Sequence, residues 1–161
     1  MLNFKDENYL KIIFLFSVIA LISAYFIEHI LGYQPCNLCL IERIPYGISI
    51  ILILIKFLFK KDEKFLILLL ILTFIFSFII SFYHFGIEQG FFQESSVCVA
   101  KGFTENMSKN DLLEQLNQKI ISCKDVTFRI FGLSLTSINI VINLLFIITL
   151  IKIFIKYEKN K

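Results

Sequence analysis

Long apolar runs alternate with shorter polar segments along the chain, and this pattern predicts four helices that cross a membrane. The apolar runs fall at residues 9–31, 42–59, 65–85 and 132–155. A helix needs about 20 apolar residues to cross a bilayer. The polar segments 32–41 and 86–131 are then outer loops, and a short polar turn at 60–64 connects the second and third spans on the opposite side. We therefore predict an all-α membrane protein, a four-transmembrane-helix bundle in which residues 1–161 form a single membrane domain with two extracytoplasmic loops.

The start of the second helix stays open from the sequence. Its uninterrupted apolar part, residues 44–59, holds about 16 residues, which is fewer than the about 20 that a span needs. In one interpretation the helix begins near Pro35 or Cys36, because proline fits the first turn of a helix. Pro45 would then lie inside the helix and bend it. In the other interpretation the helix begins at Glu42 and Pro45 lies in its first turn.

Composition agrees with a membrane protein. Hydrophobic residues make up 57% of the chain, charged residues 18%, and the mean hydropathy is +0.78. The bilayer is therefore an expected partner. No basic block with interleaved aromatic residues occurs away from the predicted membrane edges, so we expect no nucleic-acid partner.

The positive charges predict the orientation. Ten of the sixteen lysines and arginines lie at the N-terminus, in the 60–64 turn, at the C-terminus and at the span ends beside them. Cytoplasmic segments carry the excess of lysine and arginine, so we expect both termini in the cytoplasm. Both outer loops then face the other side, where an oxidising compartment allows disulfides to persist.

Four cysteines lie in these two outer loops. If the second helix begins at Pro35, then Cys36, Cys39 and Arg43 stand on one helix face, with both thiols in the positive first turn. A cation and a helix N-terminus both favour the thiolate, which is the reactive form of cysteine. Glu42 opposes this effect unless it points elsewhere or holds Arg43 in place. A structural disulfide remains the competing interpretation of a single Cys-x-x-Cys.

Cys98 and Cys123 are 25 positions apart in the long outer loop. A disulfide between them could be purely structural. Beside a redox-active Cys-x-x-Cys, however, it can take part in exchange through a mixed disulfide. A structural zinc site usually has two Cys-x-x-Cys pairs. The chain has one, so we expect no metal.

Several polar residues lie near the predicted membrane edges. His84 falls at the depth of the Cys-x-x-Cys, which makes a role in handling protons plausible. Glu28 and His29 are interpreted as ordinary interfacial residues, and Asn139 and Asn143 as contacts between helices. Helical spacing over 108–121 predicts a short helix that either lies on the membrane interface or covers the bundle.

Taken together, these features resemble the DsbB family of membrane proteins for disulfide bond formation, and the resemblance covers most of the chain. The residues that carry it are Pro35-Cys36-x-x-Cys39-x-x-Glu42-Arg43, then Tyr83-His84 and the run Gly86-Ile87-Glu88-Gln89-Gly90. The vitamin K epoxide reductase type is related in architecture. It places its Cys-x-x-Cys near the last span, whereas here the pair lies between the first two spans.

The resemblance implies a quinone-dependent thiol oxidase of the bacterial inner membrane, with the cysteine loops in the periplasm. A reduced DsbA-type protein would attack a Cys98–Cys123 disulfide at Cys98. Electrons would pass to a Cys36–Cys39 disulfide through a bond between Cys36 and Cys123. Cys39 would then face a membrane quinone, ubiquinone or menaquinone.

By the same resemblance, Arg43 would contact the quinone and His84 would lie near its ring. The competing hypothesis is a structural or assembly membrane protein whose outer loops are only held together by disulfides.

Overall fold

The structure is a computed structural model, and it describes residues 4–59, 63–94, 98, 122–124, 129–130 and 132–159. Its four long helices are α1 (Phe4–His29), α2 (Asn37–Leu58), α3 (Glu63–Glu88) and α5 (Leu135–Lys159). All four are long and apolar enough to cross a membrane. The predicted four-helix membrane bundle is therefore confirmed. The predicted helix over 108–121 lies outside the described residues.

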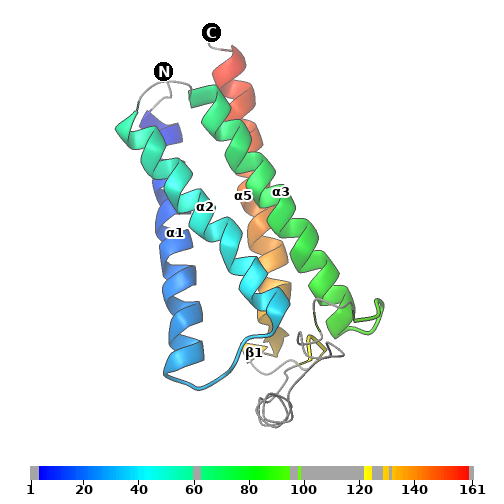
Figure 1. The fold of residues 1–161 in the computed structure, drawn as a ribbon. Helices are drawn as coiled ribbons and strands as arrows, with labels where there is room; N and C mark the ends of the chain where they lie inside the picture. Colours follow the sequence, from blue (N-terminus) through cyan, green and yellow to red (C-terminus); the bar gives the residue numbers. More distant parts are fainter. Residues whose placement is uncertain are drawn as a thin grey trace, which may run out of the picture.

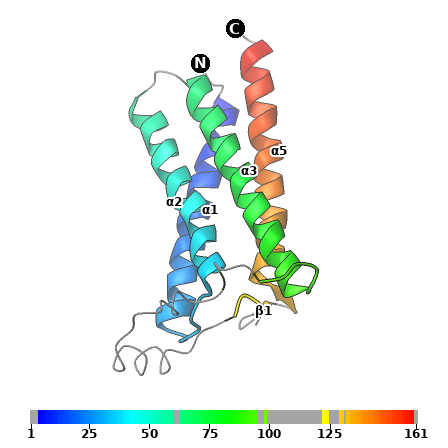
Figure 2. The same cartoon turned by 45° about the vertical axis from the view of Figure 1, so that its right-hand side comes forward.

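The helices run side by side along the bundle (Figure 1). α3 packs against α5 and α2, and α1 packs against α2, whereas α1 and α5 share few contacts. The start of α1 and the end of α5 lie at one end of the bundle, and the start of α2 and the end of α3 lie at the other. Figure 2 shows the same arrangement from another side. The cysteine-bearing segments and the site described below belong to this second end.

The core lies along the bundle axis, where each helix contributes side chains that the others cover. Leu10, Ile53, Phe74 and Leu150 are fully buried, one from each helix. The ring of Phe74 meets that of Phe146 edge to face, with centroids 5.1 Å apart. Much of the outer surface is apolar, as a helix surface in contact with lipid must be.

Helix α2 settles the question that the sequence left open. It begins at Asn37, with Cys36 as the N-cap residue and Pro45 inside the helix. The interpretation that starts the helix near Cys36 is thus confirmed, and the start at Glu42 is wrong. Residues 37–41, which were predicted to belong to the outer loop, form the first turn of α2.

The other helix ends also differ from the sequence boundaries. α3 extends to Glu88, so His84 lies within the helix rather than at its end. Gly90 follows with a φ of 78°, a left-handed conformation that glycine adopts without strain. A short hairpin of β1 (Arg129–Ile130) and β2 (Leu133–Ser134) leads into α5, so the start predicted at residue 132 lies before the helix.

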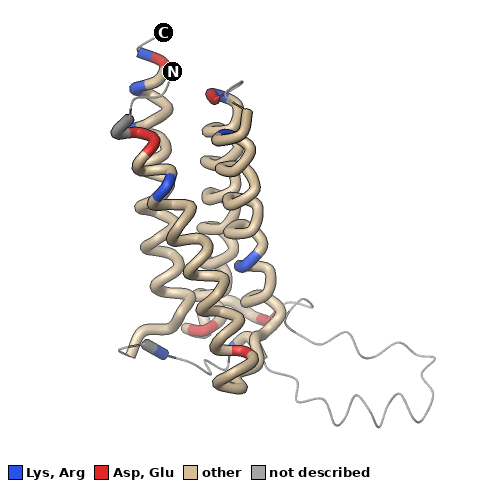
Figure 3. The backbone as a smooth tube through the Cα atoms, turned by 90° about the vertical axis from the view of Figure 1, so that its left-hand side faces the viewer, with Lys and Arg blue, Asp and Glu red and all other residues tan. Residues whose placement is uncertain are grey.

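Charged residues gather toward the two ends of the bundle, with few between them (Figure 3). At the end with the chain termini, lysines pair with acidic residues of neighbouring helices. Lys56 Nζ lies 2.9 Å from Glu7 Oε1, and Lys156 Nζ lies 2.8 Å from Asp6 Oδ2. These ion pairs tie α1 to α2 and to α5.

Candidate functional site

Cys36 and Cys39 stand at the N-terminus of α2. Their Sγ atoms are 2.8 Å apart, and both residues are free thiols. The predicted Cys36–Cys39 disulfide stays a prediction, because the structure describes the two residues as adjacent free thiols. The backbone N–H of Cys39 donates to Cys36 Sγ at 3.3 Å, as expected of an N-cap side chain. Cys36 is buried and Cys39 is half-buried.

His84 reaches Cys36 from α3. Its Nε2 lies 3.5 Å from Cys36 Sγ, and its Nδ1 lies 2.9 Å from Glu42 Oε1. The pKa of Cys36 is lowered to about 4, first by the hydrogen bond from the Cys39 thiol and then by the hydrogen bond and positive charge of His84. Burial opposes these effects and raises the pKa. Cys36 is therefore a thiolate at neutral pH.

Arg43 is held in place by contacts with α1. Its Nη1 donates to Glu28 Oε2 on α1 at 2.5 Å, and its guanidinium carbon lies 5.2 Å from the centre of the Tyr25 ring. Arg43 is not among the groups that lower the pKa of Cys36. The prediction that Arg43 tunes a thiolate therefore gains no support at Cys36 and stays a prediction. Glu28, expected to be an ordinary interfacial residue, is the partner that positions it.

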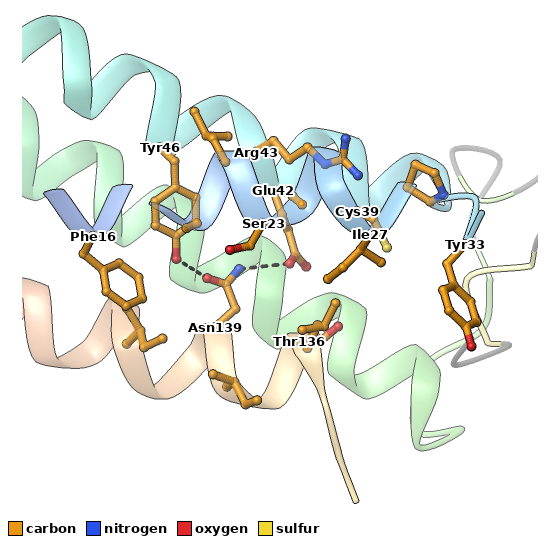
Figure 4. A pocket seen from close by; sticks show the side chains of 17 residues that line it. Phe16, Ser23, Ile27, Tyr33, Cys39, Glu42, Arg43, Tyr46, Thr136 and Asn139 are labelled. Carbon is orange, nitrogen blue, oxygen red and sulfur yellow. Dashed lines mark hydrogen bonds between the residues drawn. The ribbon is translucent and has the colours of Figure 1, made fainter. Parts of the chain in front are cut away.

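Glu42 points away from Arg43 and into the bundle. Its Oε1 accepts from His84, and its Oε2 accepts from Asn139 Nδ2 at 2.9 Å. Asn139 also donates to Ser81 Oγ at 2.8 Å and accepts from the Tyr46 hydroxyl (Figure 4). The expectation that Asn139 joins helices is confirmed. Glu42 links this network to the thiols.

The sequence interpretation gave no role to Glu42 beyond its possible effect on Arg43. It also missed Tyr46 and Ser81. One signal was present, because Cys39, Glu42 and Tyr46 recur at helical spacing on a predicted membrane helix. Acidic residues in such helices are rare and usually functional.

A second carboxylate borders the His84 ring. Glu88 Oε1 lies 3.9 Å from His84 Nε2 and accepts from the Thr136 hydroxyl at 2.6 Å. The Thr136 hydroxyl oxygen also lies 3.4 Å from His84 Nδ1. Side chains from α2, α3 and α5 thus fix the orientation of the ring.

A cavity of about 260 Å³ opens beside Cys39 between α1, α2 and α5, the side where α1 and α5 share few contacts (Figure 4). Most of its lining is aliphatic or aromatic. Its polar lining includes Cys39, Glu42, Arg43, Tyr46 and Asn139. An apolar cavity with a few converging polar groups is the usual form of a site for a small organic molecule.

The second pair, Cys98 and Cys123, forms the predicted disulfide. Both residues are 2% exposed and pack with Leu38 and Ile87 in the buried cluster that also holds Cys36. The structure thus brings all four cysteines and His84 to one end of the bundle. Arg43 lies there as well, on the lining of the cavity.

The thiols of Cys36 and Cys39 and a ring nitrogen of His84 lie within 4.8 Å of one another, close enough to hold a metal ion. A structural zinc site has four protein ligands. Within the part of the chain that the structure describes, these three donors fall one short of that number, and the short Sγ–Sγ distance fits a dithiol that closes to a disulfide.

Comparisons with known proteins agree with this geometry. The family described as "Disulfide bond formation protein DsbB" matches residues 7–153. A protein of Rickettsia prowazekii (strain Madrid E), named "Uncharacterized protein RP370", is 32% identical over 147 residues, which cover 90% of this chain and 86% of the relative. The match spans all four helices and both cysteine pairs. The chain therefore belongs to the DsbB family, the membrane oxidoreductases of disulfide bond formation.

Proposed function

We propose that the protein reoxidises a periplasmic DsbA-type dithiol protein and passes the electrons through its two cysteine pairs to a membrane quinone. One observation carries this proposal. Cys98 and Cys123 share a buried cluster with Cys36, while Cys39 borders an apolar cavity. The four sulfurs thus lie along a route from the outer loop to the membrane interior.

The exchange would run in the order that the family resemblance implies. The thiolate of the reduced partner attacks Cys98, and Cys123 leaves as a thiolate. Cys123 then attacks Cys36 of a Cys36–Cys39 disulfide, which releases Cys39 facing the cavity. The second thiol of the partner resolves its bond to Cys98 as a disulfide, and Cys98 in turn attacks Cys123 and releases Cys36. Each step moves one electron pair by thiolate attack on a disulfide.

The residues that line the cavity fit a quinone. Apolar side chains of α1 and α5 suit its ring and tail, and Arg43 on the same lining supplies a guanidinium with N–H donors. The Tyr46 hydroxyl, which donates to Asn139, leaves its oxygen as an acceptor. When bound, a quinone supplies the acceptor for two electrons and two protons. His84 is not on the lining, so we assign it to Cys36 rather than to the quinone ring.

The orientation proposed from the sequence places the chain termini in the cytoplasm and the cysteines in the periplasm of a bacterial inner membrane. Support comes from the lysines of the described residues. By the bounds of their helices, six of them lie toward the end of the bundle where α1 begins and α5 ends: Lys11, Lys56, Lys64, Lys152, Lys156 and Lys159. Cytoplasmic ends of membrane helices carry such an excess.

The test is quinone reduction by the purified protein in detergent, driven by a reduced DsbA-type protein, with Cys36→Ala as the control. Turnover that disappears in Cys36→Ala would establish transfer from thiols to quinone. Absence of turnover with both ubiquinone and menaquinone, in a folded protein with its disulfides intact, would favour the structural membrane protein. The low pKa of Cys36 argues against that second function, because a purely structural cysteine has no need of a stabilised thiolate.

A further inference from the structure

We infer, on the basis of the proposed function, that Glu42 carries the proton of Cys36 through His84 to the quinone cavity. The sequence and the family comparison assign no role to this residue. The inference rests on where the two oxygens of one carboxylate lie and on which of the two thiols can reach the cavity.

The two thiols of the reduced pair face different surroundings. Cys39 is part of the cavity lining, whereas Cys36 is not. Cys36 Sγ instead meets His84 Nε2 within the protein. A proton from Cys39 can thus leave directly into the cavity. A proton from Cys36 needs a carrier.

Glu42 is placed to be that carrier. Its Oε1 accepts from His84 Nδ1 at 2.9 Å, on the ring edge opposite the nitrogen that meets Cys36. Its Oε2 lies beside Asn139 Nδ2, and both residues are on the cavity lining. The carboxylate therefore touches the histidine on one side and the cavity on the other. Only 9% of Glu42 is exposed, so its carboxylate exchanges protons with His84 and the cavity rather than with bulk water.

The reaction balances with this one carrier. In the reduced pair Cys36 is a thiolate, and His84 Nε2 already holds the proton that Cys36 has lost. When the pair closes to a disulfide, the S–H bond of Cys39 breaks and one S–S bond forms, and a bound quinone would accept the two electrons and two protons. His84 Nδ1 gives one proton to Glu42 Oε1. The acid form of Glu42 then releases a proton into the cavity and returns to the carboxylate. Cys39 supplies the second proton.

Glu88 is the competing acceptor. Its Oε1 lies 3.9 Å from His84 Nε2, and it is not on the cavity lining. Among the described residues, the other charged groups around His84 are Glu42 and the Cys36 thiolate, since α5 offers only the neutral Thr136 and Asn139. A route through Glu88 would lead the proton away from the cavity.

The test compares Glu42→Gln, which keeps the shape, with Glu42→Asp, which keeps a proton carrier on a shorter side chain. If Glu42 carries the proton, kcat of quinone reduction falls about 10²-fold or more in Glu42→Gln, in the range typical of general acid–base catalysis. The fall in Glu42→Asp is smaller, because the aspartate still carries a proton. If Glu42 only fills space, kcat falls more in Glu42→Asp, which shortens the side chain, than in Glu42→Gln, which keeps its shape. The Kd of an unreducible quinone analogue should change little in either variant. Asp6→Asn removes another buried, paired carboxylate at the far end of the bundle and is the matched control.

A second measurement needs no quinone. In the reduced protein, Glu42 holds the protonated His84 ring against the Cys36 thiolate, so alkylation of Cys36 at pH 5 should slow in Glu42→Gln and less in Glu42→Asp. Unchanged alkylation in Glu42→Gln would overturn the inference. So would a loss of quinone reduction in Glu88→Gln that exceeds the loss in Glu42→Gln.

These outcomes are distinct from a failure of the proposed function. If the unaltered protein reduces no quinone, the proposed function itself is wrong. If the unaltered protein and Glu42→Gln reduce quinone at the same rate, the function stands and the proton route through Glu42 is wrong.

Discussion

Replacing His84 with alanine tests the electrostatics of the site most directly. The thiolate of Cys36 is stabilised by the Cys39 thiol and by His84, and the substitution removes only the second. We therefore expect the pKa of Cys36 to rise but to remain below the ordinary value for cysteine. With a raised pKa, Cys36 is a thiolate over a narrower pH range, because it takes up its proton at a higher pH as acid is added.

The magnitude follows from the contact. A hydrogen bond to a charged group contributes about 1.5–3 kcal/mol, which corresponds to about 1–2 pKa units at 1.36 kcal/mol per unit. Starting from about 4, the pKa of Cys36 in His84→Ala becomes about 5–6. At pH 5 the thiolate fraction then falls from about nine-tenths to between about one-half and one-tenth, whereas at pH 7 it changes little.

The assay is site-resolved alkylation of the reduced, quinone-free protein across pH 4 to 8, with Cys36 followed by mass spectrometry. Since only the thiolate reacts, the rate at pH 5 should drop about two- to tenfold and the rate at pH 7 should stay nearly constant. His29→Ala is the matched control, because His29 is exposed and its Nδ1 meets only the carbonyl of Tyr25. An alkylation midpoint that does not move in His84→Ala would refute the role assigned to the ring.

Three other substitutions probe separate parts of the site. Arg43→Ala should raise the KM for quinone more than it slows exchange with the partner, and equal losses in both steps would count against its place on the cavity. Asn139→Leu leaves an oxygen of Glu42 unpaired within the bundle and should lower stability by about 1–3 kcal/mol, measured by reversible unfolding in detergent micelles; an unchanged midpoint would show that the network contributes nothing. Cys98→Ser should abolish turnover driven by the partner while chemically reduced Cys36 still delivers electrons to quinone, and loss of both activities would contradict the order of the two pairs.

The sequence predicted the bundle well because its signal is local. About 20 apolar residues in a row suffice to define a span, and an even number of spans places both cysteine loops on one side. The spacing of Cys36 and Cys39 also identified the reactive end of α2. Each of these inferences depends on neighbours along the chain.

The partners of the polar residues depend instead on how the helices rotate against one another. Glu42 bonds to His84, which lies 42 positions further along, and to Asn139, which lies 97 positions further along. Arg43 follows Glu42 in sequence but leaves α2 in another direction and meets Glu28 on α1. Because successive residues of a helix point about 100° apart, adjacent side chains serve different neighbours. The sequence could name the residues but could not say which neighbour each one meets.

The burial of the Cys98–Cys123 disulfide restricts which thiols can reach its sulfurs. At 2% exposure, neither sulfur presents a target to small thiols in solution, and in-line attack by a thiolate requires access to the sulfur. If the proposed function holds, this burial would keep free thiols such as glutathione from reducing the disulfide and passing electrons to the quinone. In the proposed exchange, a protein partner would have to displace the side chains that pack with Cys98, such as those of Leu38 and Ile87, to reach its sulfur. The packing around the disulfide would then contribute to the choice of the electron donor.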